Sequence, residues 1–315
     1  YSPYSGAGTC GHWLFEPQRT NLITQSELFI GGGWTPSNIT ITSDYGISPD
    51  GTNNSTRLVF GSGVAYINRA SGIGVGEQAS SIYVKGISGQ ILKFGKGGNV
   101  GSGTNFSLNG EWQRLEQIST NSGTAYHITS NLGGANATEV EVWGAQLEEQ
   151  SFATSYIPTS GSTVTRNQEA AFGSGNSDLI NSTEGVIYAE IAALANDGGL
   201  RLLQLSDGTN ANRVSLYYDT TTNRIYSNVV VNSVSNPLSG NINVLNFTKV
   251  AVTWKQNDFG LWINGLKVGT DTSGSSFPNN TLNDLSFSLN GLYNFFGKTK
   301  CLAVFKEALT DDELE

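Results

Sequence analysis

Four ionisable side chains in the first half of the chain have a spacing that could support chemistry on a sugar. Glu139 and Glu141 alternate with valines, so both carboxylates lie on one face of a strand. A retaining glycosidase needs two carboxyl groups about 5–5.5 Å apart. Tyr83 and Lys85 share a strand face in the same way. A polysaccharide lyase needs such a base and a cation that neutralises the uronate carboxylate.

Neither pair completes a catalytic set. The carboxylate strand resembles that of laminarinase-type hydrolases, but Trp143 stands beyond the pair and the third acid of their motif is absent. The lyase pair lacks a recognisable companion strand with Gln or His and Arg. A histidine-based triad would have to use His12 or His127, the two histidines of the chain. We therefore expect no catalytic residue and a solvated outer face for the carboxylates, and a polysaccharide lyase or hydrolase stays as an alternative.

Aromatic residues beside amides and carboxylates are typical of sugar-binding surfaces. Tyr217 and Tyr218 are adjacent, so one side chain points inward and the other outward if they lie on a strand. Packing in a core is the competing interpretation for each ring. The candidates for carbohydrate binding are Trp34, Trp112, Tyr217, Tyr218, Tyr226 and Trp262.

Metal and thiol chemistry has few candidates. Asp207 and Asp258 are possible calcium ligands, and each is also explained as a turn residue. Calcium is the one cofactor that the sequence suggests. Cys10 and Cys301 lie at opposite ends of the chain, and we expect two separate thiols and no disulfide framework.

Composition favours short strands joined by many turns. The 315 residues include 39 glycines, 14% are charged, and the formal net charge is −9. With no basic stripe, we expect no nucleic-acid partner. No apolar run approaches the ~18 residues of a membrane helix, so we expect no membrane insertion. The chain contains no methionine, and we expect a processed product or a piece of a longer protein.

The elements that would position these residues are short strands. About eight or nine strands are expected before residue 150, the density of an antiparallel sandwich, with a glycine-rich loop over 95–103. A second set follows, in which Asn264-Gly265 is the strongest hairpin signal. The residues after Val231 read as a polar loop. Thr310 and Glu313 predict a capping box that opens a helix.

The segment Val142–Arg166 divides the chain. Its first half alternates like a closing strand, and its second half is rich in Ser and Thr with Pro158 and a glycine. We expect an all-β protein of two tandem antiparallel jelly-roll sandwiches. The expected parts are an arm or the end of a preceding module (1–13), the first sandwich (14–150), an extended linker (151–166) and the second sandwich (167–315). Tyr156, Ile157 and Pro158 are apolar for a free linker, so we expect them to pack on one or both domains and fix their relative angle.

The first half resembles carbohydrate-binding jelly-roll modules and, more closely, a segment of marine bacteriophage tail-fibre and structural proteins. In that segment an opening Leu-Glu-Pro-Gln-Arg-Thr-Asn-Leu string leads to Trp-Gly-Ala-Gln-(Leu/Val)-Glu and then Ser-Tyr-Ile-Pro-Thr. The strings here are Phe15–Leu22, with Phe15 in place of Leu, then Trp143–Glu148 and Ser155–Thr159.

The second half resembles concanavalin A-like, laminin-G-like jelly rolls, through Lys249–Thr253, Gly260–Val268 and Cys301–Leu309. Together the resemblances imply a virion tail fibre or extracellular appendage that is not an enzyme and binds host-surface glycans in adhesion. They also imply other fibre subunits as partners and a homotrimer. A purely structural fibre or decoration module is the other alternative.

Overall fold

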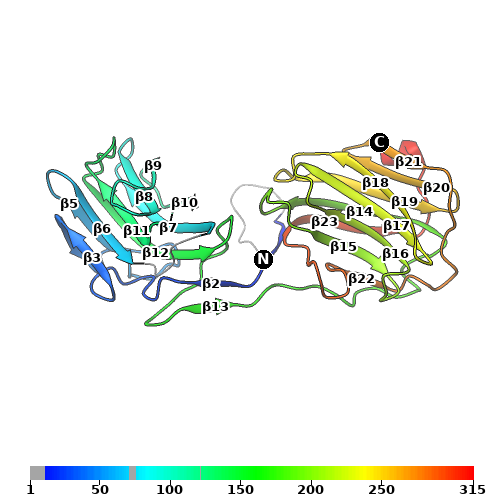
Figure 1. The fold of residues 1–315 in the computed structure, drawn as a ribbon, viewed down its shortest axis with the longest axis horizontal. Coiled ribbons are helices and arrows are strands. Elements are labelled where there is room, and N and C mark those ends of the chain that lie inside the picture. The colour runs from blue at the N-terminus through cyan, green and yellow to red at the C-terminus, as the bar shows by residue number, and fades with distance from the viewer. Residues whose placement is uncertain (1–10, 71–75, 121) are drawn as a thin grey trace. The chain divides into compact units, whose positions relative to one another are not determined.

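The computed structural model describes residues 11–70, 76–120 and 122–315, and nearly all of the regular structure is antiparallel β (Figure 1). The chain divides into two compact units, each a β-sandwich. One unit is Gln18–Asn167, here called the first sandwich. The other combines Gln168–Glu315 with the residues up to Pro17, and is called the second sandwich. The expectation of an all-β protein with two tandem sandwiches is confirmed.

The first sandwich is built from two five-stranded sheets and a short two-stranded ribbon. The β7–β12 sheet has the order β10 (Gln113–Ser119), β7 (Gln78–Gly86), β12 (Glu139–Glu149), β5 (Thr56–Phe60), β4 (Ile39–Thr42). The β6–β11 sheet has the order β3 (Trp34–Ser37), β6 (Ala65–Ala70), β11 (Ala125–Ser130), β8 (Ile91–Gly97), β9 (Thr104–Ser107). The ribbon pairs β2 (Arg19–Asn21) with β13 (Val164–Arg166).

Strand alternation decides which side chains fill the first core. Ile82 and Val84 on β7, and Val140 and Val142 on β12, are fully buried or nearly so, and the residues between them face outward. The opposite sheet contributes Ile67, Phe94, Tyr126 and Ile128 among others. The outer face of the β7–β12 sheet therefore carries the intervening polar and aromatic residues.

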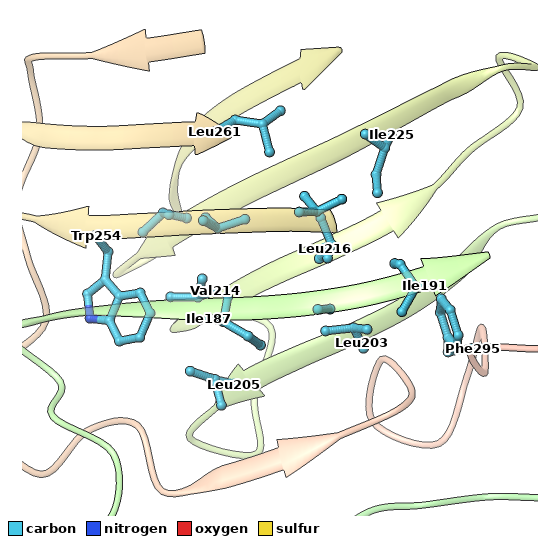
Figure 2. Close-up of a cluster of buried hydrophobic side chains, with 14 of the residues drawn as sticks. Ile187, Ile191, Leu203, Leu205, Val214, Leu216, Ile225, Trp254, Leu261 and Phe295 are labelled. Atoms are coloured by element: carbon cyan, nitrogen blue, oxygen red, sulfur yellow. The ribbon is translucent and has the colours of Figure 1, made fainter. Parts of the chain in front are cut away.

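The second sandwich has a six-stranded and a five-stranded sheet. The β14–β19 sheet has the order β1 (Trp13–Phe15), β23 (Gly297–Phe305), β14 (Glu184–Ala193), β19 (Thr248–Lys255), β20 (Asp258–Ile263), β21 (Leu266–Asp271). The β16–β17 sheet has the order β18 (Val234–Asn241), β17 (Arg224–Val231), β16 (Arg213–Tyr218), β15 (Arg201–Ser206), β22 (Asp284–Ser286). Between them lies an aliphatic core closed by Trp254 and Phe295 (Figure 2).

Two local expectations are confirmed. Asn264 and Gly265 both have positive φ, 50° and 81°, and join Ile263 to Leu266 as a tight hairpin. Thr310 precedes helix α1 (Asp311–Leu314), and its backbone N–H and hydroxyl each donate to the Glu313 carboxylate at 2.8 Å.

The two compact units begin and end at other residues than expected, both near residue 17 and near residue 167. Residues 13–15 form β1, which pairs with β23 of the second sandwich, and Phe15 stacks on Phe287 at 4.6 Å. The first sandwich is thus inserted in the chain between β1 and the rest of the second sandwich. The expected linker, 151–166, belongs to the first sandwich, whose last strand is β13.

One expected loop is a strand, and another is a strand over its first three residues. Residues 234–241 form β18, where a polar loop was expected, and β8 extends through Gly97 into the expected 95–103 loop. β18 lies at the edge of its sheet and contains Pro237, and an edge strand tolerates proline because one side of it needs no ladder hydrogen bonds. Its polar residues carry no alternation that would have revealed it.

Candidate functional site

The opening string, Phe15–Leu22, contains a buried asparagine, Asn21. The Asn21 side chain donates to the carbonyls of Ala145 (3.1 Å) and Ile157 (2.9 Å). Its oxygen accepts from the backbone N–H groups of Ile23 (3.0 Å) and Leu147 (3.2 Å). The amide therefore makes two hydrogen bonds as donor and two as acceptor, and these connect the opening strand to β12 and to the exit segment 150–160.

The other two strings close the same network. Gln146 accepts from the Ile157 N–H at 2.7 Å and donates to Glu148 at 2.8 Å. Glu148 is fully buried and also accepts from the backbone N–H (2.9 Å) and hydroxyl of Thr154. Thr159 N–H donates to Ser26 at 2.8 Å. The three strings thus meet at one place, where hydrogen bonds connect the first and last segments of the sandwich to β12. This structural role explains why these positions carry Asn, Gln, Glu and Thr without requiring catalysis.

The exit segment also covers one end of the outer face of the β7–β12 sheet. Ile157 is 3% exposed, and the Tyr156 ring lies 4.5 Å from Trp143 and 6.5 Å from Tyr83. Gly144, with φ of 66°, makes room, since a Cβ there would meet Tyr156 at 3.3 Å. The expected packing on the first sandwich is confirmed for Tyr156 and Ile157, whereas Pro158 is exposed and that part of the expectation is wrong. That the segment fixes the relative angle of the domains stays a prediction.

The uncovered end of that face brings Lys85 beside Glu139 and Glu141, whereas Tyr83 lies at the covered end. Lys85 on β7 and Arg57 on β5 flank Glu141 on β12 in one row of the sheet. Lys85 Nζ lies 3.6 Å from Glu141, which also accepts from the Ser55 hydroxyl at 2.8 Å. Arg57 forms an ion pair with Glu139, and this hydrogen bond raises the pKa of Arg57.

Aromatic and aliphatic side chains surround this row and make it a groove of about 260 Å³. Tyr45, 48% exposed, forms one wall and lies under the Arg57 guanidinium at 4.9 Å. Ile87 lines the groove and is exposed. Trp112, two residues after the groove residue Gly110, is half-buried and does not line the groove, and its indole N–H donates to the Ile47 carbonyl at 3.1 Å.

The chemistry available in this groove, here called the charged groove, is hydrogen bonding beside a ring. Each carboxylate is paired with a cation, so the cations and carboxylates balance. Tyr45 and Arg57 were not among the sequence candidates. The signal that could have found them is the register of β5, β12 and β7, which a single sequence does not carry.

The structure separates the six candidate aromatics into three environments. Trp34 and Tyr218 are 5% and 3% exposed and fill the two cores. Burial raises the pKa of Tyr218. Trp262 is 3% exposed on the outer face of the β14–β19 sheet, packed with Leu309 and Leu314 beside a cavity of about 530 Å³. None of these three rings offers an open face.

The remaining three candidates are accessible. Trp112 stands two residues after the groove residue Gly110, as described above. Tyr217 and Tyr226 are half-buried on neighbouring strands of the β16–β17 sheet and stack at 5.3 Å with an interplanar angle of 14°. The expectation that one of the adjacent tyrosines faces inward is confirmed, since Tyr218 lies in the core and Tyr217 on the outer face.

The candidate calcium ligands and Cys301 do not line the charged groove. Asp207 accepts from Thr209 N–H (2.8 Å), Thr209 hydroxyl (2.6 Å) and Asn212 (2.8 Å), all within the β15–β16 turn. Asp258 begins β20 on the other sheet. No group of three or more His, Cys, Asp or Glu suited to a metal occurs in the described part of the chain, and calcium at either aspartate stays a prediction. Cys301 is a free thiol in β23, and Cys10 lies outside the described residues.

No protein family and no curated protein matches the sequence. Solved structures of similar fold include the CBM40 domain of Ruminococcus gnavus IT-sialidase bound to α2,3-sialyllactose, with 19% identity over 46% of this chain and 94% of that chain, TM-score 0.37. A Limulus polyphemus SAP-like pentraxin has 16% identity over 43% of this chain and 70% of the pentraxin chain, with a TM-score of 0.36. Domains LG4-5 of the mouse laminin α1 chain have 10% identity over 97% of this chain and 96% of the laminin chain, with a TM-score of 0.31. No helix among the described residues is long and apolar enough to cross a membrane.

Proposed function

We propose that this chain is a non-enzymatic glycan-binding module whose first sandwich takes a neutral oligosaccharide in the charged groove. The observation that carries the proposal is the groove itself, where an exposed tyrosine stands beside four charged hydrogen-bonding side chains. Sugars bind by packing a ring face on an aromatic side chain while hydroxyls exchange hydrogen bonds with charged and amide groups.

The charge balance of the groove selects the ligand class. Arg57 is paired with Glu139 and Lys85 with Glu141, so an anionic sugar would have to displace a carboxylate. A neutral hydroxyl can instead donate to a carboxylate and accept from a cation without breaking either pair. The same pairs argue against a free general acid or base, and so for binding without turnover.

The biological setting proposed for this module is a bacteriophage tail fibre or a similar extracellular appendage that adheres to glycans of a host surface. It rests on the resemblance of three strings to a segment of marine phage structural proteins. Assembly into a homotrimer with other fibre subunits is part of this proposal, and sedimentation equilibrium of the purified chain tests it.

A panel of immobilised neutral oligosaccharides tests the binding function. We expect at least one ligand to bind the full chain, and Tyr45→Ala to weaken it about fivefold because the ring contact contributes roughly 1 kcal/mol. Tyr293→Ala, which removes an exposed tyrosine of the second sandwich, is the matched control and should bind normally. No binding across the panel, or unchanged affinity of Tyr45→Ala, would reject the proposal.

The same ligands test the claim that the module is not an enzyme. Incubation with the full chain should release no new reducing ends and no unsaturated products. Turnover that disappears in Glu139→Gln or Glu141→Gln would instead assign a hydrolase to the groove.

A further inference from the structure

The second sandwich carries a separate surface that the charged groove does not explain. It is the outer face of the β16–β17 sheet around Tyr217 and Tyr226, here called the tyrosine face. Strand register orders its side chains in rows. Tyr217 and Tyr226 form one row, and Gln204, Ser215 and Asn228 form the next.

Two arginines lie at the ends of the tyrosine face. Arg224 has its guanidinium 5.4 Å from the centre of the Tyr226 ring and donates to the Ser239 hydroxyl at 2.7 Å. Arg213 donates to the Asn210 carbonyl. Arg224 lies opposite position 219, so the two arginines are six residues apart along the strands, about 20 Å at ~3.3 Å per residue.

Neither arginine has a carboxylate partner among the described residues. The acids nearest to Arg213 by register are Asp207, opposite Asn212, and Asp284, one strand further away. Asp207 accepts from Thr209 and Asn212, and Asp284 from the Ser286 hydroxyl. Asp219, opposite Arg224, accepts from Thr220 N–H at 2.6 Å. The Nε atoms of Arg213 and Arg224 are buried without a hydrogen-bond partner. The Nε atom of Arg57 in the charged groove is likewise buried without a partner, so the difference between the two surfaces lies in the ion pairs, which only the cations of the charged groove form.

Two further side chains between the arginines have polar atoms without a hydrogen-bond partner among the described residues. Gln204 and Ser215 are 0% and 1% exposed, and Gln204 Oε1 and Ser215 Oγ have no partner among the described residues. Buried polar atoms are nearly always satisfied by protein, water or ligand. These two atoms lie in the row next to the tyrosines but beneath the surface, so a ligand on the face does not reach them, and an internal water is the partner expected for them.

We propose that the tyrosine face is a second binding site, specific for an anionic sugar chain that carries carboxylate or sulfate groups. The planar guanidinium fork matches either anion, since both present two oxygens in a plane. The anionic groups contact Arg213 and Arg224, and the tyrosine edges and hydroxyls contact the sugar between them. The net charge of −9 does not oppose this, because charges beyond about 8 Å are largely screened at physiological salt.

Calorimetric titration of the full chain tests this site. The probes are four chains of equal length: a uronic-acid oligosaccharide, a sulfated oligosaccharide, a neutral oligosaccharide and a single-stranded oligonucleotide. We expect Arg213→Gln/Arg224→Gln to weaken binding of the anionic sugar at least tenfold, and Lys255→Gln to leave it unchanged. Lys255 is a matched control, an exposed cation of the other sheet. Affinity should also fall as salt rises from about 50 mM to about 500 mM.

The two anionic sugars distinguish carboxylate from sulfate recognition, and binding of either supports the site. Wild-type affinity in the double glutamine variant, absence of salt dependence, or equally tight binding of the oligonucleotide would overturn the assignment. If the glutamine variant does not fold, Arg213→Lys/Arg224→Lys keeps both charges and should lose the advantage that the fork provides, again about tenfold. Tyr45→Ala should leave this binding intact, so the second site stands or fails separately from the charged groove.

Discussion

The charged groove of the first sandwich and the tyrosine face of the second both place tyrosines beside two cations on the outer face of a sheet. They differ in what the cations contact. Arg57 and Lys85 are paired with Glu139 and Glu141 from the neighbouring strand β12. Arg213 and Arg224 have only carbonyl and hydroxyl partners. The comparison teaches that strand register, which decides whether a carboxylate stands next to a cation, controls whether a cation on a sheet face is left without an ion pair.

The largest expected effect is a loss of stability in the first sandwich, which carries the charged groove, while the second sandwich with the tyrosine face stays stable. Asn21→Ala leaves two carbonyls and two N–H groups of the first sandwich without their buried partner, so we expect a loss of about 3 kcal/mol in its unfolding free energy. Hydrogen exchange followed by peptide should show the loss in β2 and β12 and none in β16 and β17. Asn105→Ala, which removes one exposed hydrogen bond, is the control. Equal loss in both sandwiches would refute their separate stability.

The reverse experiment weakens the sandwich that carries the tyrosine face. Phe15→Ala removes the ring that stacks on Phe287, and we expect about 2 kcal/mol of destabilisation confined to the second sandwich. Trp13→Ala on the same strand is the control, since Trp13 is 56% exposed, and it should cost under about 0.5 kcal/mol. Loss of protection in the first sandwich would contradict the assignment of β1.

A smaller difference between the sandwiches should appear on acidification. Burial lowers the pKa of His127 in the first sandwich, so the unfolded state binds its proton first as pH falls below about 6.5. The stability that this histidine supplies is present above that pH and declines below it. The pKa of His12 is lowered too, by burial and by Lys298 and Lys300, but His12 is only half-buried.

We therefore expect denaturant unfolding between pH 7 and pH 5 to show a steeper decline for the first sandwich than for the second. His127→Gln should flatten that decline, and an unchanged slope would show that another group titrates.

The smallest expected effect is a gain of affinity for an anionic sugar in the charged groove, the property proposed for the tyrosine face. Glu141→Gln leaves Lys85 unpaired, so we expect the charged groove to gain a few-fold in affinity for a uronic-acid oligosaccharide, in proportion to a surface ion pair of about 0.5 kcal/mol. Calorimetry in the background of Arg213→Gln/Arg224→Gln isolates this gain. Glu77→Gln, an exposed carboxylate of the same sandwich, should give none.

Strand register explains why sequence reasoning found parts of the charged groove without recognising the whole. Glu139 and Glu141 on one strand, and Tyr83 and Lys85 on another, were each evident from alternation. Their meeting depends on β7 and β12 being neighbours with Glu141 opposite Lys85. The partner of a strand is set by contacts far along the chain, which local alternation does not encode.

The amino-acid sequence by itself determined the all-β class, the inward and outward faces of most strands, the Asn264-Gly265 hairpin and the capping box. These follow from local physics: side chains alternate across a strand, and few residues accept positive φ or cap a helix. Tertiary structure alone decided that β1 completes the second sandwich, that polar β18 is a strand, and which cations meet carboxylates. Those outcomes depend on pairing between distant segments, where burial and backbone hydrogen bonding outweigh the preferences of single residues.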